Sequence, residues 1–354
     1  MIELRSDTLT QPTPGMRSAI ANAVVGDEQK REDPTVLELE WRAAELLGQE
    51  ESVFLPTATM ANQIALRILT EPGDVLIAEE HSHVMIAEQG GSAALSGLFT
   101  RPLPGVAGRL APEQIRAAMT DPRSGHEPVT KLVSVENTHN SSGGRVWPLA
   151  ELHAMVETCR ELGLSVHLDG ARVANAAVAL GVPAAEIGRR FDTVTLCLSK
   201  GLGCPLGAVV AGSEELMRRA RRAKHLFGGA MRQAGIVAAA GVYALDHHVE
   251  RLADDHARAR RLAEGLAAAG LPIALETVET NFVQIDVAPL ELTKADALER
   301  LKRAGVGLSS TVHPSRLRAV THLDVTDDDV DRAIGLIPRA LGVSATRTAV
   351  PAGR

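Results

Sequence analysis

The chain has 354 residues, a hydrophobic content of 45% and a formal net charge of −7 at pH 7. This length provides for two domains, or for one large domain with a smaller appendage, and the acidic balance argues against a nucleic-acid-binding protein. No apolar run approaches the length of about eighteen residues that spans a membrane, and the start lacks the pattern of a secretion signal.

The cysteines and the aromatic residues narrow the chemistry. Cys159, Cys197 and Cys204 are odd in number and lack metal-ligand spacing, so we expect reduced thiols, a cytoplasmic protein and no metal site. Aromatic residues make up 2% of the chain. Few aromatic side chains are therefore present to stack on a cofactor ring.

In chain order, hydrophobic periodicity predicts helices and strands that alternate through the first half of the sequence. The expected helices cover residues 36–48, 57–69, 148–162 and 173–180. The expected strands cover residues 52–55, 75–78, 131–136, 164–169 and 193–198. Because strands separated by helices indicate βαβ units, we expect an α/β fold with a mostly parallel sheet.

After Tyr243 the texture of the sequence changes. One long helix is expected over residues 245–269, followed by strands at 281–287, 307–311 and 318–323 and a last helix at 326–341. We therefore predict a large domain at 1–245, to whose site segment 1–30 contributes, a small domain at 246–345 and a frayed tail at 346–354.

Two polar residues mark the ends of neighbouring predicted strands. Asp169 ends one strand, and Lys200 follows the next and enters a run with glycines at 201, 203 and 207. Open α/β folds bind ligands at the carboxyl ends of their strands. An acid for a pyridinium nitrogen and a lysine for a Schiff base are the groups that pyridoxal phosphate (PLP) chemistry requires. Taken singly, Asp169 is typical of a helix N-cap and Lys200 of a solvated lysine, but the pair favours PLP.

Eight motifs extend this interpretation along the chain. They are LRSDTLTQPT (4–13), DPTVLELE (33–40), PTATMAN (56–62), ENTHN (136–140), HLDGAR (167–172), LSKGLGCPLG (198–207), GGAMRQ (228–233) and VTHLDV (320–325). In this order they resemble the L-threonine aldolase family of the low-specificity or L-allo-threonine type, which is related to the β-eliminating lyases. The resemblance runs from about residue 2 to residue 341.

The resemblance implies a fold, an activity and an assembly. The fold is the fold-type-I, aspartate aminotransferase-like large domain with a mostly parallel sheet, plus a small α+β C-terminal domain. The activity is PLP-dependent aldol cleavage of L-threonine, L-allo-threonine or related β-hydroxy-α-amino acids to glycine and an aldehyde, a carbon–carbon lyase reaction. The assembly is a homo-oligomer. It is expected to be at least a homodimer, and a homotetramer if two dimers associate.

Two other interpretations stay open at this point. Another PLP reaction on the same scaffold, such as transaldol chemistry, β-elimination or transamination, is compatible with the fold. A non-catalytic protein that keeps the fold is the second alternative.

The resemblance also assigns residues to the cofactor. Lys200 holds it covalently, Asp169 pairs with the pyridine nitrogen, and His83 stacks on the ring. Thr57, Ala58 and Thr59 open a helix after a strand, where free N–H groups and the helix dipole suit a phosphate. The remaining cofactor-side candidates are Ser199 and Lys224 near the phosphate, Arg172, and Arg232, which is expected to reach a neighbouring subunit's site.

For the substrate, the resemblance assigns Ser6, Arg172 and Arg318 to the carboxylate, which an arginine fork binds in bidentate fashion. Arg316 is the alternative to Arg318. His126 matches a family histidine near the substrate hydroxyl, whose proton a histidine can remove at neutral pH. His81 lies close to His83 in the sequence and could be confused with it.

The chain departs from the family pattern at two positions. Ala58 stands where the family usually has glycine, and its methyl group narrows the approach of a phosphate and excludes an easy positive φ. Lys30 stands where many members have tyrosine, which puts the natural substrate in doubt more than the reaction type.

Overall fold

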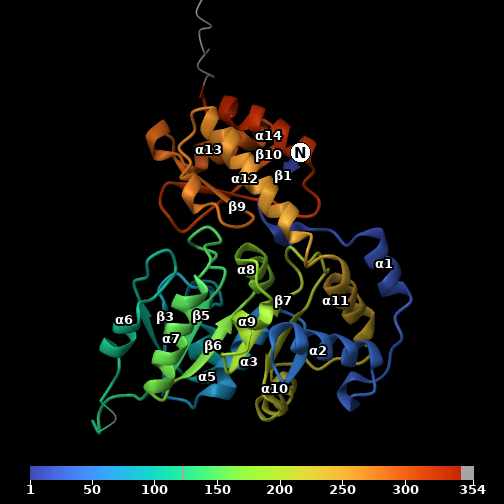
Figure 1. Ribbon diagram of the computed structural model, residues 1–354, viewed down its shortest axis with the longest axis vertical. Helices are drawn as coiled ribbons and strands as arrows, with labels where there is room; N and C mark the ends of the chain where they lie inside the picture. The colour runs from blue at the N-terminus through green and yellow to red at the C-terminus, as the bar shows by residue number, and fades with distance from the viewer. Residues whose placement is uncertain (122, 344–354) are drawn as a thin grey trace, which may run out of the picture. The chain divides into compact units, whose positions relative to one another are not determined.

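The computed structural model describes residues 1–121 and 123–343, so the tail expected at 346–354 lies outside the described residues. The chain divides into two compact units (Figure 1). The large unit comprises residues 10–253, and the small unit joins residues 1–9 to the described residues from Asp254 onward.

A seven-stranded sheet in the order β2-β8-β7-β6-β5-β3-β4 forms the centre of the large unit. Its strands are β2 (Glu51–Leu55), β3 (Val75–Glu79), β4 (Phe99–Leu103), β5 (Thr130–Glu136), β6 (Ser165–Asp169), β7 (Thr193–Cys197) and β8 (Ala208–Gly212). The five strands from β7 to β4 are parallel, and β8 runs antiparallel to both β7 and β2. The expectation of a mostly parallel sheet is therefore confirmed.

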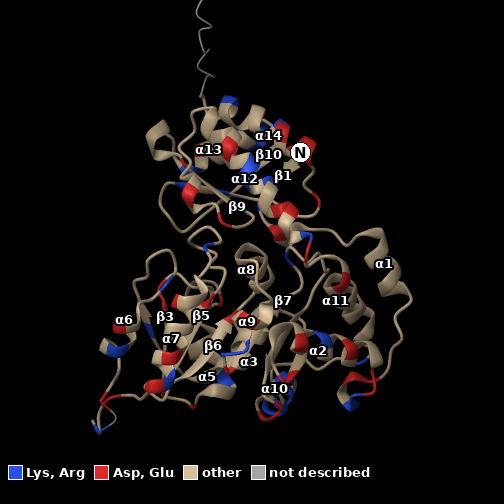
Figure 2. Ribbon diagram, viewed as in Figure 1, with Lys and Arg blue, Asp and Glu red and all other residues tan. Residues whose placement is uncertain are grey.

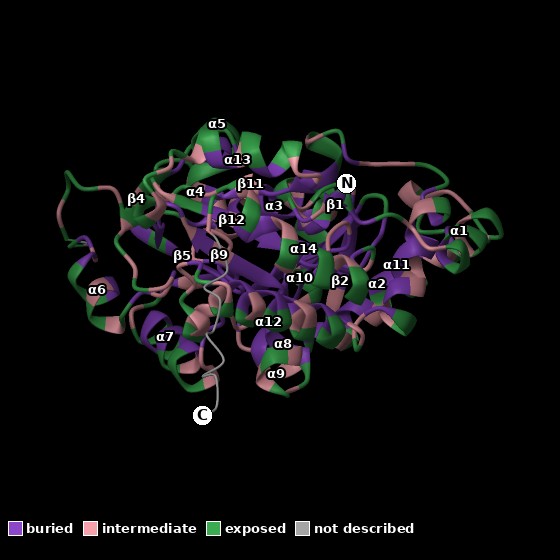
Figure 3. Ribbon diagram, turned by 90° about the horizontal axis from the view of Figure 1, so that it is seen from above, coloured by how far each residue is buried: buried purple, intermediate pink, exposed green. Residues whose placement is uncertain are grey.

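The large unit also contains helices. They are α1 (Pro14–Ala21), α2 (Pro34–Leu47), α3 (Ala58–Leu69), α4 (His83–Ile86), α5 (Gly91–Ser96), α6 (Pro112–Ala117), α7 (Leu149–Glu161), α8 (Val173–Leu180), α9 (Ala184–Gly188), α10 (Glu214–Leu226) and α11 (Gly235–His247), with a 3₁₀ helix η2 (Glu28–Lys30). The central strands are buried, whereas the helices carry exposed faces outward (Figure 3). Basic residues are concentrated on α10, whose first turn is acidic (Figure 2).

The small unit has its own sheet and core. Strands β11 (Ser309–Ser310), β12 (Arg316–Val320) and β9 (Phe282–Asp286) are antiparallel, and β1 (Ile2–Glu3) pairs in parallel with β10 (Val306–Gly307). Helices α13 (Lys294–Arg303) and α14 (Asp327–Ala340) pack with them, along with 3₁₀ helices η1 (Asp7–Leu9), η3 (Leu275–Thr277) and η4 (Ala288–Leu290). Helix α12 (Leu252–Ala268) begins in the large unit and continues into the small one.

Two sequence expectations need correction. The single helix predicted over 245–269 is two helices, because α11 ends at His247 and α12 begins at Leu252. At the break, the buried His248 ring bonds through Nδ1 to the carbonyl of Leu202, at 2.7 Å. The strand expected over 307–311 is likewise divided between β10 and β11. In the described part of the chain, no helix combines the length and the apolar character needed to cross a membrane.

Candidate active site at the carboxyl edge of the sheet

Three adjacent parallel strands end in buried carboxylates. β3 ends at Glu79, β5 at Glu136 and β6 at Asp169, and Lys200 follows the end of β7. Because these strands run in the same direction, all four side chains originate at one edge of the sheet. The sequence rule that selected Asp169 and Lys200 therefore applies equally to Glu79 and Glu136, which the sequence analysis passed over.

Asp169 is held by two N–H donors. Its Oδ2 accepts from Asn62 Nδ2 at 2.8 Å, and its Oδ1 accepts from the Ala171 N–H at 3.1 Å. Its side chain is buried. Both carboxylate oxygens therefore have a fixed partner, which gives the side chain a defined orientation at the edge of the sheet.

The orientation of Asn62 is fixed by a buried histidine. Burial lowers the pKa of His167 to about 4, so its ring is neutral at pH 7. His167 Nε2 lies 3.2 Å from Asn62 Oδ1, and Nδ1 lies 2.9 Å from Thr193 Oγ1. Because an amide oxygen only accepts, Nε2 carries the proton and Nδ1 accepts from the Thr193 hydroxyl. Asn62 must therefore point its Nδ2 group toward Asp169.

Lys200 carries an available amine. It is half-buried, its carbonyl accepts from the Gly203 N–H at 2.8 Å, and its Nζ has no hydrogen-bond or ion-pair partner among the described residues. The following segment turns back into β8 at Gly207, whose φ is +114° and where a Cβ would come within 2.8 Å of the Phe54 ring. Glycine at that position therefore permits the short return that leaves Lys200 at the edge.

The start of α3 presents free backbone donors. Thr57 caps the helix, with Oγ1 accepting from the Met60 N–H and its carbonyl accepting from the Ala61 N–H, each at 3.1 Å. The N–H groups of Ala58 and Thr59 have no partner among the described residues. Ala58 is the first helical residue and is not among the positive-φ residues, so alanine in place of glycine costs no backbone strain there.

His83 lies at the start of α4. Its N–H donates to Glu136 Oε2 at 2.6 Å, and its Nδ1 lies 2.8 Å from Glu88 Oε1. The hydrogen bond to Glu88 raises the pKa of His83 against the effect of burial; Asp169 adds to the rise and Lys200 opposes it. The structure thus brings His83 together with Asp169 and Lys200. His81, in contrast, has a side chain that is 48% exposed and sits 3.8 Å from Glu79 and Glu80.

His126 is not brought to this edge within the chain. It is exposed and precedes the amino end of β5, whereas Glu136 lies at the carboxyl end. Seven strand residues at about 3.3 Å each separate the two ends by roughly 20 Å. The expectation that His126 lies near the reacting groups is therefore not met by a single copy of the chain.

The other cofactor-side candidates of the large unit differ in their surroundings. Arg172 is buried at the N-cap of α8, three residues after Asp169. Ser199 Oγ lies 3.5 Å from Cys197 Sγ. Arg232 is exposed and forms an ion pair with Asp27 at 3.0 Å.

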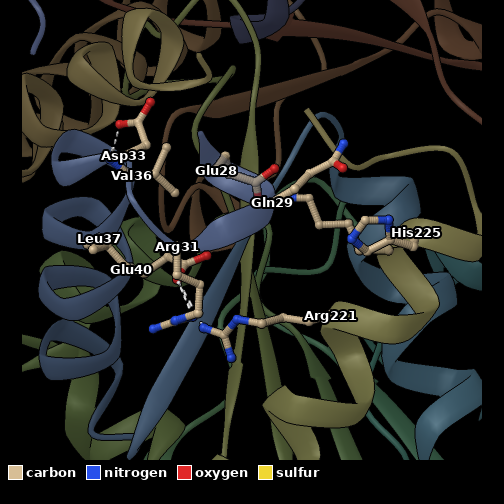
Figure 4. Close-up of a pocket in the computed structure, with 10 residues that line it drawn as sticks. Glu28, Gln29, Arg31, Asp33, Val36, Leu37, Glu40, Arg221 and His225 are labelled. Carbon is tan, nitrogen blue, oxygen red and sulfur yellow. Dashed lines mark hydrogen bonds and ion pairs between the residues drawn. The ribbon is translucent and has the colours of Figure 1, made fainter. Parts of the chain in front are cut away.

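Lys224 is buried and already paired. Its Nζ forms an ion pair with Glu28 and donates to the Phe54 carbonyl at 2.7 Å. Nearby, Arg31 and Arg221 reach toward Glu40 in a pocket of about 110 Å³ (Figure 4). These contacts give Lys224 a bond to the strand that precedes α3 rather than an unpaired amine.

Two expected carboxylate ligands belong to the small unit. Arg318 Nε donates to Ser309 Oγ at 3.1 Å, and its guanidinium lies 5.4 Å from the centre of the Phe282 ring. Ser309 Oγ also donates to the carbonyl of Arg5, the residue before Ser6, at 2.9 Å. Arg318 and Ser6 are therefore close together within that unit. The exposed Arg316 contacts Gln284 Oε1 at 3.4 Å.

The residues of the large unit fit a PLP group. They supply an unpaired amine at Lys200, a buried and oriented carboxylate at Asp169, and two unsatisfied N–H groups at the start of a twelve-residue helix. These are the partners needed by an aldehyde, a pyridinium nitrogen and a phosphate respectively.

Comparisons with known proteins show the family of the chain. A family model described as beta-eliminating lyase matches residues 3–288. The chain is 40% identical to a probable low-specificity L-threonine aldolase from Arabidopsis thaliana, covering 93% of this chain and 94% of that one. It is also 40% identical to the low specificity L-threonine aldolase of Escherichia coli K12, covering 93% and 96%.

Solved structures share the fold. A threonine aldolase from Leishmania major superposes with a TM-score of 0.82 at 22% identity, covering 96% of this chain and all (100%) of that one. A serine palmitoyltransferase from S. paucimobilis, solved with a PLP–myriocin adduct, superposes with a TM-score of 0.73 at 18% identity, covering 97% and 88%. At these identities the likeness concerns the fold alone.

Proposed function

The chain belongs to the beta-eliminating lyase family, within its L-threonine aldolase branch, and from this premise we propose that it cleaves β-hydroxy-α-amino acids. It is a PLP-dependent carbon–carbon lyase, with L-threonine and L-allo-threonine as substrates and glycine and acetaldehyde as products. The observation that carries the proposal is the unpaired Lys200 amine at the same sheet edge as the buried, doubly hydrogen-bonded Asp169.

Bound PLP supplies the electron sink that accepts the electron pair released when the Cα–Cβ bond breaks. Lys200 would bind the group through its amine, and the Ala58 and Thr59 N–H groups would donate to its phosphate. Asp169 would accept a hydrogen bond from the pyridinium nitrogen, and the donors Asn62 and Ala171 keep its carboxylate oriented for this. Groups that are already oriented in this way would hold the cofactor in a defined position.

Proton removal from the β-hydroxyl is assigned to His83. The hydroxyl must lose a proton as Cβ becomes an aldehyde, and a histidine is suited to take it near neutral pH. His83 is favoured over His126 because it contacts Glu88 and Glu136 beside Asp169, whereas His126 precedes the opposite end of β5. An imidazole in this position can also lie against the cofactor ring.

The substrate carboxylate is assigned to Arg172, with Ser6 and Arg318 retained as partners on the strength of the family resemblance. Arg232 is retained as a residue that reaches a neighbouring subunit, and a cytoplasmic homotetramer remains the proposed assembly. Lys30 is exposed and has no ion-pair partner among the described residues. Its presence in place of the usual family tyrosine bears on the preferred β-substituent more than on the reaction type.

The rival PLP reactions are separated by their products. Incubation with L-threonine should yield glycine and acetaldehyde in equal amounts, whereas β-elimination yields 2-oxobutyrate and ammonia. Transamination would consume an added oxo acid. L-allo-threonine should also react and D-threonine should not. Formation of 2-oxobutyrate without glycine, or purification without any bound or bindable PLP, would refute the proposal.

A further inference from the structure

Glu88 is a buried carboxylate that the mechanism above leaves unexplained. It follows α4, and its side chain is 0% exposed. Three donors surround it: Asn62 Nδ2 at 2.9 Å from Oε1, Gln63 Nε2 at 2.6 Å from Oε2, and His83 Nδ1 at 2.8 Å from Oε1. An unpaired buried carboxylate would be costly, so this number of partners indicates an ionised group that is held in place.

The contacts determine which ring nitrogen of His83 carries a fixed proton. Amide nitrogens only donate, so both Glu88 oxygens are acceptors toward Asn62 and Gln63. The same Oε1 faces His83 Nδ1, which must therefore be protonated. His83 Nε2 has no partner among the described residues, so it is the nitrogen left to exchange a proton.

Asn62 extends this arrangement to the cofactor side. Its single Nδ2 group donates to Glu88 and to Asp169, and its Oδ1 is held by neutral His167. One amide thus joins the carboxylate behind His83 to the carboxylate assigned to the pyridinium nitrogen. The relative placement of those two carboxylates therefore depends on the orientation of the Asn62 side chain.

We propose that Glu88 is a positioning residue for the cleavage reaction, holding the Nδ1 proton of His83 so that Nε2 is the atom that takes the β-hydroxyl proton. This inference rests on the proposed function. Glu88 strengthens His83 as a base because a carboxylate fixes the tautomer of a catalytic imidazole and stabilises its protonated form. The other charged groups facing His83 are Asp169 from β6, Lys200 from the segment after β7, and Glu136 from β5 on its N–H.

The kinetic test compares Glu88→Gln with the wild type across pH. Removing the anion lowers the pKa of His83, so the base is deprotonated at lower pH and the acid limb of kcat/KM moves to lower pH. The plateau falls about ten- to a hundredfold through kcat, because the remaining imidazole is a weaker and less well oriented base. Glu80→Gln is the matched control, since it removes an exposed carboxylate beside His81, and it should leave the profile unchanged.

The second readout does not require turnover. In full-length protein labelled at histidine, with and without PLP, the His83 signal is assigned by its loss in His83→Asn. Its titration midpoint should lie above the ordinary histidine value of about 6.5 in the wild type and in Glu80→Gln, and should fall by about one unit in Glu88→Gln. Glu88→Asp keeps the charge but withdraws it by one methylene, so it should give a smaller fall.

If Glu88→Gln does not fold, Glu88→Asp alone decides the question. An unchanged His83 titration in the folded variant would overturn the inference, as would an acid limb that stays fixed while only Tm falls. Failure of the wild type to form glycine, with the His83 shift intact, would instead refute the proposed activity.

Discussion

Lys200 is the residue on which covalent attachment of PLP depends in the proposed mechanism. Lys200→Ala should abolish turnover, the visible absorbance of the bound cofactor and the link that borohydride makes permanent. The exposed Lys131→Ala is the control and should behave as wild type. A borohydride-stable link in Lys200→Ala would mean that another lysine is the anchor.

His83 and His126 lie toward opposite ends of β5, so their substitutions should have different effects. His83→Asn should slow cleavage by about a hundred- to ten-thousandfold. It should also alter the visible spectrum, because His83 interacts electrostatically with both Asp169 and Lys200. His126→Asn should cost less than about tenfold, since it lies at the other end of β5. Steady-state glycine formation and absorbance spectra measure both effects, and the reverse ranking would return the proton to His126.

For single residues, the sequence predicted those functional candidates that stand at the end of a strand. Asp169 and Lys200 follow from strand ends, and the same reasoning could have found Glu79 and Glu136. Asn62 and Glu88 could not be found this way, because each acts through contacts made only after α3 packs over β6. A helix residue and a loop residue give no periodic signal of such a role.

The start of helix α3 has two roles, the Thr57 cap that stabilises the helix and the proposed binding of the PLP phosphate. A control substitution at another helix cap can distinguish the two. Thr57→Ala removes the Oγ1 bond to the Met60 N–H, which should lower the free energy of unfolding by about 1 kcal/mol and weaken PLP retention. Thr326→Ala removes the equivalent cap of α14, in the small unit. It should cost a similar stability while leaving PLP affinity unchanged. Chemical denaturation and cofactor titration test the pair, and equal losses of PLP affinity would contradict the assignment.

The sequence predicted the ends of helices most accurately where it contains capping residues. Helix α2 begins after Asp33 and ends at Gly48, and α8 has the predicted bounds. Strands β4 and β8 were missed. β4 is a largely exposed edge strand that contains Pro102, and β8 follows a glycine run that resembles a loop. At the break between α11 and α12, His248 forms a tertiary hydrogen bond to the Leu202 carbonyl, a contact that helix periodicity does not encode.

For the molecule as a whole, His167 links stability to pH. Its pKa of about 4 in the folded protein lies below the ordinary histidine value of 6.5 that applies to the unfolded chain. The unfolded state therefore binds more protons between these values, and the free energy of unfolding falls as the pH drops from 6.5 toward 4. The contribution is at most about 3 kcal/mol.

Urea denaturation at pH 7 and pH 5, at fixed protein concentration, measures this dependence. His167→Gln should be less stable than wild type at pH 7, because it disturbs the bonds to Asn62 and Thr193, but should lose less on acidification. An equal loss in both proteins would show that other groups carry the acid sensitivity.

The pairing of β1 with β10 constrains how the chain is made. Ile2 lies opposite Val306, so the β1 segment finds its partner strand only after the large unit between them has been synthesised. Ile2 and Leu4 are buried in the small unit, and they must stay exposed while the large unit forms. Slow translation therefore lengthens the time during which this apolar segment is open to chaperones and to aggregation, whereas the seven-stranded sheet can close before β10 is synthesised.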